Sequence, residues 1–184
     1  NHYNVIGTEL LWVRGPLSIQ SEAMVNFVDQ SAGVYNGTPI PANRTVNFNN
    51  GFTNAILAGA YAQVGYFLTG EHRPYDRKTG TIDRIIPHRS FGPWRDDGIS
   101  GWGAWEVAGR WSHLDLNDRN IRGGRITDFT AGVNWYLNPY WKMQFNYINS
   151  NPDYTVQEPP AGTPQSAFSR STTHMYDLRC QFDF

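Results

Sequence analysis

The sequence has a single cysteine, little excess charge and no long hydrophobic run, and each of these absences excludes a class of protein. Cys180 alone cannot form an internal disulfide, and it excludes a cysteine-rich zinc site. No stretch of 18 apolar residues occurs, which excludes a transmembrane helix. Lys and Arg number 15 against 16 Asp and Glu, a net charge of −1. Nucleic acid is therefore excluded as the main partner, because binding it requires a large basic excess.

The 184 residues correspond to about one ordinary domain, and this domain is rich in aromatic side chains. There are 7 Trp, 10 Tyr and 10 Phe, but only 17% of the residues are charged. Such a composition is consistent with a soluble β-sandwich or with a membrane β-barrel. The chain also lacks an initiator methionine and a signal peptide, so we expect Asn1 to be a processed or truncated end.

Alternation of apolar and polar residues is the dominant pattern, and it predicts β-strands. In the last stretch, Tyr176, Leu178 and Phe182 fall on one face, and Asp177 and Arg179 on the other. The predicted strands are roughly 9–15 residues long, whereas ordinary strands average about 5–6 and membrane-spanning strands need about 9–11. This length favours the barrel over the sandwich. The seven strands are 3–14, 17–28, 55–70, 102–113, 127–137, 140–148 and 176–184.

The connections between these strands are of two kinds. Two are tight turns, at Gly15-Pro16 and Asn138-Pro139. With the C-terminus in the periplasm, both tight turns fall on the periplasmic side and the long polar connections fall outside, as in outer-membrane barrels. The long polar connections are 29–54, 114–125 and 149–171.

The number of strands is odd, whereas a single-chain bacterial barrel has an even number and returns both ends to the periplasm. We therefore expect the chain to be the C-terminal part of a larger barrel, with residues 1–184 forming one barrel region. An eighth short strand near Arg44–Asn49 is the alternative. The sandwich alternative would place the aromatic side chains in a dry core.

Four ordered motifs stand out along the chain, ELLWVRGPLSIQ (9–20), GYFLTGEHRPYD (65–76), GWGAWE (101–106) and NWYLNP (134–139). Together they resemble the phosphate-selective porin family of O and P type. This resemblance covers most of the chain and implies the C-terminal half of a sixteen-stranded, homotrimeric pore in the outer membrane of a Gram-negative bacterium. It implies small anionic or polar solutes and outer-membrane lipid as partners, with selectivity set by basic residues that line the pore.

The segment 71–101 is too long for a periplasmic turn, and it is rich in basic residues. We expect it to fold into the lumen as a constriction, because Arg holds oxyanions bidentately and stays charged. Its acidic residues reduce the net charge to +1, so a periplasmic plug with internal Arg–Asp pairs is the alternative. The anion-binding candidates within it are Arg73, Arg77, Lys78, Arg84 and Arg89.

The strand alternation also predicts which charged residues line the lumen. Three are basic, Arg110, Lys142 and Arg179, and these complete the set of anion-binding candidates. Five are acidic, so the strands alone do not form an anion filter. The acidic residues are Glu22, Glu106, Asp128, Asp177 and Asp183.

The five histidines show neither metal-ligand spacing nor an accompanying nucleophile motif, so we expect no enzyme activity, metal or cofactor. The predicted function is passive diffusion of small hydrophilic solutes through an outer-membrane porin, with a preference for anions such as phosphate. The alternative is a structural or adhesive barrel that acts through its outer loops, 29–54 and 149–171.

Overall fold

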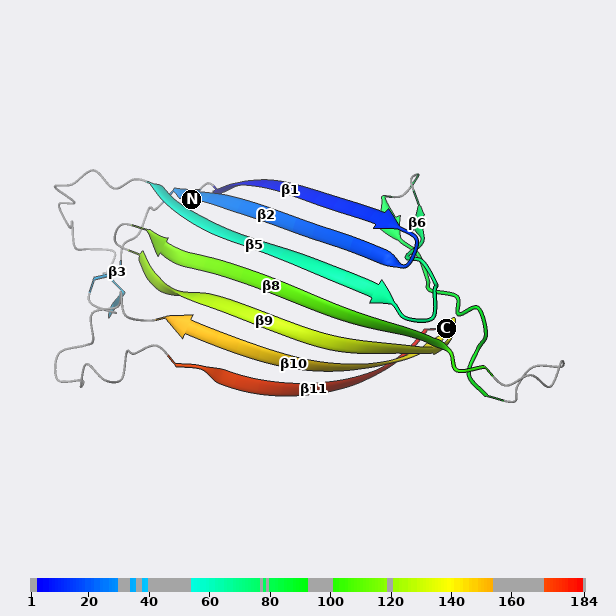
Figure 1. The fold of residues 1–184 in the computed structure, drawn as a ribbon. Helices are drawn as coiled ribbons and strands as arrows, with labels where there is room; N and C mark the ends of the chain where they lie inside the picture. The colour runs from blue at the N-terminus through cyan, green and yellow to red at the C-terminus, as the bar shows by residue number, and fades with distance from the viewer. Residues whose placement is uncertain are drawn as a thin grey trace.

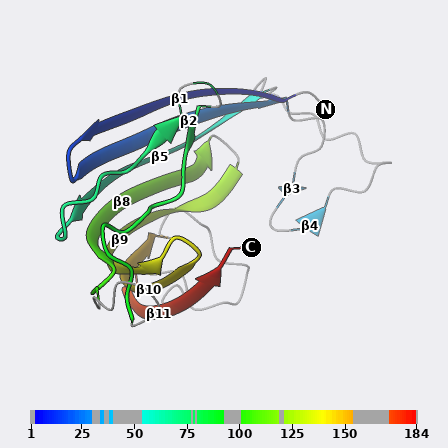
Figure 2. The same cartoon turned by 90° about the vertical axis from the view of Figure 1, so that its right-hand side faces the viewer.

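The chain forms one curved antiparallel sheet, which is seen face-on in Figure 1 and end-on in Figure 2. The structure is a computed structural model. It describes residues 3–29, 34–35, 38–39, 54–76, 78, 80–92, 101–118, 121–153 and 171–183. No helix within these ranges is long and apolar enough to cross a membrane.

All seven predicted strands are present, and each pairs with its neighbour in chain order. They are 10 to 18 residues long. Two hairpins of two-residue strands accompany them, β3 (Val34–Tyr35) with β4 (Thr38–Pro39), and β6 (Tyr75–Asp76) with β7 (Thr81–Ile82). The strands of the sheet are β1 (Tyr3–Arg14), β2 (Leu17–Asp29), β5 (Asn54–Phe67), β8 (Ala104–Asp118), β9 (Ile121–Asn138), β10 (Trp141–Asp153) and β11 (Thr173–Phe182).

The two ends of the sheet differ. The tight turns between β1 and β2 and between β9 and β10 lie at one end, together with the segment that joins β5 to β8 (Figure 1). We call this the turn end and the opposite one the loop end. At the first turn Gly15 has a φ of 56°, a backbone conformation that favours glycine and lets β1 reverse directly into β2.

The prediction of a long polar loop at 114–125 is wrong. β8 and β9 continue as a paired ladder to Asp118 and Ile121 at the loop end. Polar side chains bridge the two strands there, since Arg125 Nε lies 2.7 Å from Asp115 Oδ2. Leu114 and Ile126 lie opposite each other on the polar face, whereas Asp115 and Arg125 lie on the apolar face. The alternation thus changes phase here, and it no longer indicates the same strand although the pairing continues. The possible strand at 44–49 lies outside the described residues.

Pairing with β2 settles the facing of β1, which its apolar run leaves ambiguous. Trp12 lies opposite Ile19, and Glu9 lies opposite Glu22. Residues directly opposite in an antiparallel pair share a face of the sheet. Trp12 therefore belongs to the apolar face and Glu9 to the polar face.

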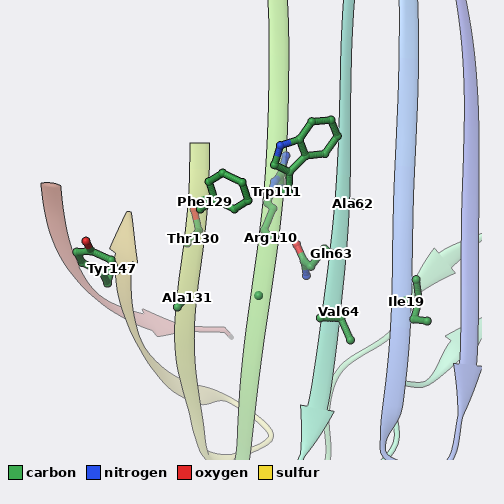
Figure 3. A pocket seen from close by; sticks show the side chains of 11 residues that line it. Ile19, Ala62, Gln63, Val64, Arg110, Trp111, Phe129, Thr130, Ala131 and Tyr147 are labelled. Carbon is green, nitrogen blue, oxygen red and sulfur yellow. The ribbon is translucent and has the colours of Figure 1, made fainter. Parts of the chain in front are cut away.

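The apolar face of the sheet is exposed. Val133, Phe145 and Leu178 are 37%, 47% and 67% exposed, although a sandwich would bury them between two sheets. The structure thus does not support the sandwich alternative. A groove of ≈ 470 Å³ lies on this face, where small residues such as Gly109 and Ala131 separate larger side chains (Figure 3).

The polar face is the crowded one. A Cβ added at Gly65 would lie 2.5 Å from Glu106 Oε1, whereas one added at Gly109 on the apolar face would find its nearest atom at 3.8 Å. Side chains converge on the inside of a curved sheet and diverge on the outside. We therefore assign the polar face to the concave side of the arc in Figure 2.

The sheet does not close on itself within the described residues, and β1 and β11 form its two edges. The expectation of an all-β antiparallel fold is confirmed. Closure into a barrel and the total of sixteen strands stay predictions.

A small apolar cluster fixes the turn end of the sheet. It consists of Phe67, Ile85, Ala104 and Tyr136, with the Phe67 and Tyr136 rings 5.8 Å apart between centroids. Ile85 comes from the segment between β5 and β8, whereas the other three come from the sheet. Burial of Ile85 therefore holds this segment against the polar face of the sheet.

Candidate functional site

The concave polar face is the candidate site, because it gathers charged side chains from every long strand except β5. The pairing registers place seven of the eight predicted inward charges on this face and add Glu9, directly opposite Glu22; Asp183 lies beyond the last paired residue of β11. Basic residues come from β8, β10 and β11, while β1 and β2 contribute only acidic ones. The charged strand residues of this face are Glu9, Glu22, Glu106, Arg110, Asp128, Lys142, Asp177 and Arg179.

Glu106 is the centre of a polar cluster near the turn end. Its side chain is fully buried and forms an ion pair with the Arg73 guanidinium. Asn134 Nδ2 and the Tyr136 hydroxyl donate hydrogen bonds of 2.9 and 3.0 Å to Glu106 Oε2. Arg73 Nε donates a further bond of 3.3 Å to Ser18 Oγ. Both carboxylate oxygens of Glu106 thus have partners, which a buried charge requires.

A second buried carboxylate, Glu71, holds the same segment. Glu71 Oε1 accepts a 3.0 Å hydrogen bond from the His88 backbone N–H, and its other oxygen accepts one from the Thr69 hydroxyl. Thr69 Oγ1 in turn accepts a 3.0 Å bond from the Trp105 backbone N–H, at the start of β8. Glu71 therefore joins the two parts of the connecting segment to each other and to the sheet.

The β6–β7 hairpin faces the inner wall of β1 and β2. Tyr75 and Ile82 of the hairpin, together with Glu9, Leu11 and Gln20 of the wall, line a gap of ≈ 200 Å³. The segment thus covers part of the polar face at the turn end, but it does not close tightly onto β1 and β2.

The segment leaves the polar face by crossing the rim of the sheet. The Phe91 backbone N–H donates a 2.6 Å hydrogen bond to the Leu137 carbonyl. The Phe91 ring meets the Trp135 ring edge-on, with 4.9 Å between centroids. Since Trp135 lies on the apolar face, this end of the segment is held against the apolar side of the sheet.

The three predicted basic residues of the strands lie on the polar face. The Arg110 guanidinium stacks over the Tyr61 ring, 3.9 Å from its centroid. Lys142 and Arg179 are on neighbouring strands, where Gln181 lies opposite Lys142, and Gln144 opposite Arg179. Two cations with amide groups beside them form a surface that suits a small oxyanion.

The predicted basic residues of the segment that the structure describes are not gathered into one site. Arg73 is paired with Glu106, and Arg84 stacks over the Tyr140 ring at 4.6 Å. The side chains of Lys78 and Arg89 are exposed. Arg77 lies outside the described residues.

The pairing of Arg73 with Glu106 is the feature that sequence reasoning missed. Alternation correctly placed Glu106 on the polar face of the sheet, but with the expectation of a side chain in contact with solvent. The two residues are 33 positions apart, and only the fold-back of the segment brings them together. No local sequence pattern predicts such a contact. Gly65 beside Glu106 only leaves the space that the carboxylate fills.

Known proteins from two bacteria are similar in sequence to this chain. Porin O of Pseudomonas aeruginosa is 28% identical over 159 residues, a match that covers 82% of this chain and 30% of the relative. An uncharacterized protein of Caulobacter vibrioides is 34% identical over 95 residues, or 52% of this chain and 18% of that protein. The matched region thus spans less than a third of either relative.

The family model described as "Phosphate-selective porin O and P" matches residues 1–184, the whole chain. This match confirms the resemblance indicated by the four ordered motifs. The chain belongs to the phosphate-selective porin O and P family.

Proposed function

We propose that this chain forms part of the wall of an outer-membrane porin, through which small hydrophilic solutes diffuse passively. The apolar face meets lipid and the polar face lines water. Anions such as phosphate are the preferred solutes. The segment between β5 and β8 narrows the aperture at the turn end.

The distribution of charge on the apolar face is the observation that carries this proposal. On β9 this face is uncharged from Trp135 as far as Arg125, which pairs with Asp115 of β8. The ten residue steps between Trp135 and Arg125 correspond to about 33 Å along the strand and, at a tilt of about 40°, about 25 Å along the barrel axis. This height matches the apolar band of outer-membrane barrels.

Aromatic residues mark the turn-end boundary of this band. The Trp105 and Trp135 rings stack at 5.0 Å, and the Trp141 and Phe182 rings also stack at 5.0 Å. Such rings are typical of the interface between lipid and water, where one part of the ring is apolar and the other wet. Their position supports a membrane boundary at the turn end.

The preference for anions is supported by Lys142 and Arg179, but acidic residues on β1 and β2 oppose it. The experiment is therefore a measurement of the reversal potential of the full-length protein in planar bilayers with a KCl gradient, followed by phosphate titration. We expect ohmic channels, an anion-selective potential and block of the chloride current by phosphate. A cation-selective potential would remove the phosphate preference and leave the porin. The absence of any channel would favour a structural or adhesive barrel.

The location and assembly extend the proposal. The relative named Porin O comes from a Gram-negative bacterium, and we place this protein in the outer membrane of such a cell, as a homotrimer. Cell fractionation and native-mass measurement of the detergent-extracted protein test both points. Recovery in the soluble fraction, or as a monomer, would contradict them.

A further inference from the structure

We propose that Arg73 and Glu106 form a latch that holds the segment between β5 and β8 on the inner wall. Arg73 is then a positioning residue for the aperture and not an anion-binding residue. This inference rests on the proposed pore, since it concerns the position of the segment that narrows it.

The burial of Glu106 is the first reason for this assignment. The side chain is 0% exposed, while Arg73 is 15% exposed. A buried carboxylate is strongly unfavourable unless a cation and hydrogen-bond donors replace water around it. Arg73 is the cation that neutralises Glu106 here, so its own charge is largely unavailable to a passing anion.

The shape of the surrounding wall is the second reason. Gly65 on β5 leaves the space into which Glu106 Oε1 projects, because an added Cβ would lie 2.5 Å from that oxygen. Ser18 on β2 and Tyr136 on β9 complete the cradle through hydrogen bonds to Arg73 and Glu106. Four neighbouring strands therefore contribute to one site that receives a side chain of the connecting segment.

The position of Arg73 along the segment determines what the loss of its contact would change. Arg73 anchors the segment just before the β6–β7 hairpin, and Ile85 and Phe91 anchor it after the hairpin. Between them the β6–β7 hairpin faces the wall across a gap of ≈ 200 Å³. Among the described residues, loss of the Arg73 anchor would leave Glu71 as the last contact that holds the segment before the hairpin. The hairpin would then move more, so the aperture would widen and fluctuate.

The test compares Glu106→Gln with wild type in the full-length protein. We expect heat-stable Glu106→Gln barrels whose single-channel conductance is higher and noisier. In detergent, we expect trypsin to cleave the segment after Lys78, Arg84 or Arg89 roughly tenfold faster or more, because local opening exposes the chain.

Gly65→Ala tests the same latch without removing a charge. Its added methyl displaces the Glu106 carboxylate, so it should reproduce both effects of Glu106→Gln. Gly7→Ala on the same face is the matched control, because its Cβ would find the nearest atom, Met24 Cγ, at an ordinary 3.5 Å. We expect Gly7→Ala to behave as wild type.

The outcomes separate the latch from the proposed function. If wild type conducts and both variants match it in conductance and trypsin sensitivity, the latch is overturned. It is also overturned if the variants only lower the yield of folded barrels, while the inserted channels and their cleavage are unchanged. If wild type forms no channel, the porin proposal fails, but faster cleavage of Glu106→Gln and Gly65→Ala would still support the latch.

Discussion

A lysine placed at the middle of the apolar face tests the assignment of the two faces directly. Ala131 lies on the apolar face of β9, four residue steps from Trp135 and six from Arg125, so it sits near the middle of the uncharged band. Thr130 is the preceding residue and belongs to the polar face. Ala131→Lys and Thr130→Lys therefore add the same charge at the same depth, on opposite sides of the wall.

The expected difference follows from the two environments. A Lys on the lipid face near the midplane costs about 2–4 kcal/mol, which falls to about 0–1 kcal/mol near the interface. Ala131→Lys should thus lower the folding equilibrium constant by about 30- to 800-fold. Thr130→Lys meets water and should stay within about 1 kcal/mol of wild type. Thr127→Lys, close to the loop-end boundary of the same apolar face, should give an intermediate or small loss.

The assay is the folding of full-length protein into lipid vesicles during a urea titration. Tryptophan fluorescence reports folding, and the heat-dependent shift of mobility in gels reports the closed barrel. If Ala131→Lys costs no more than Thr130→Lys, the apolar face does not meet hydrocarbon. If Thr127→Lys costs as much as Ala131→Lys, depth has no influence and a membrane cannot be the cause.

Three further predictions concern selectivity and stability. The double substitution Lys142→Ala with Arg179→Ala should shift the reversal potential towards the value of a cation-selective channel, without loss of heat stability. An unchanged reversal potential would show that these two residues do not contribute to anion selectivity. Asp115→Asn should change the free energy of unfolding by no more than about 1 kcal/mol, because its pair with Arg125 is partly exposed to solvent. Gly103→Ala should lower the temperature at which the barrel unfolds in gels, since Gly103 has a φ of 70° and an added Cβ would strike a backbone carbonyl; unfolding at the wild-type temperature would contradict this.

The sheet was predictable because alternation survives wherever one face of a strand is apolar and the other polar. Phe129 and Val133 with Thr130 and Asn134 are sufficient to identify β9. Alternation stops indicating the strand where the apolar and polar residues no longer keep to their own faces. Towards the loop end Leu114 and Ile126 lie on the polar face and Asp115 and Arg125 on the apolar face, and the register shifts between Asp115 and Asn117. Pairing therefore continues there although the alternation no longer matches the rest of the strand.

The site was predictable only in part, for a related reason. The facing of Arg110, Lys142 and Arg179 follows from counting along a strand. The partner of Arg73 does not, because it depends on where a 31-residue segment returns to the wall. That position is fixed by contacts such as the burial of Ile85, between residues far apart in the chain.

The two edge strands govern how this part of the protein could enter a bilayer. Along β1, 12 residues long, and β11, 10 residues long, one side of the backbone meets no strand among the described residues. In hydrocarbon each N–H or C=O group without a partner costs several kcal/mol. A lone copy of this sheet would therefore join any extended chain within reach, including another copy of itself. On the proposed membrane location, both edges therefore need partner strands before or while the sheet enters the hydrocarbon.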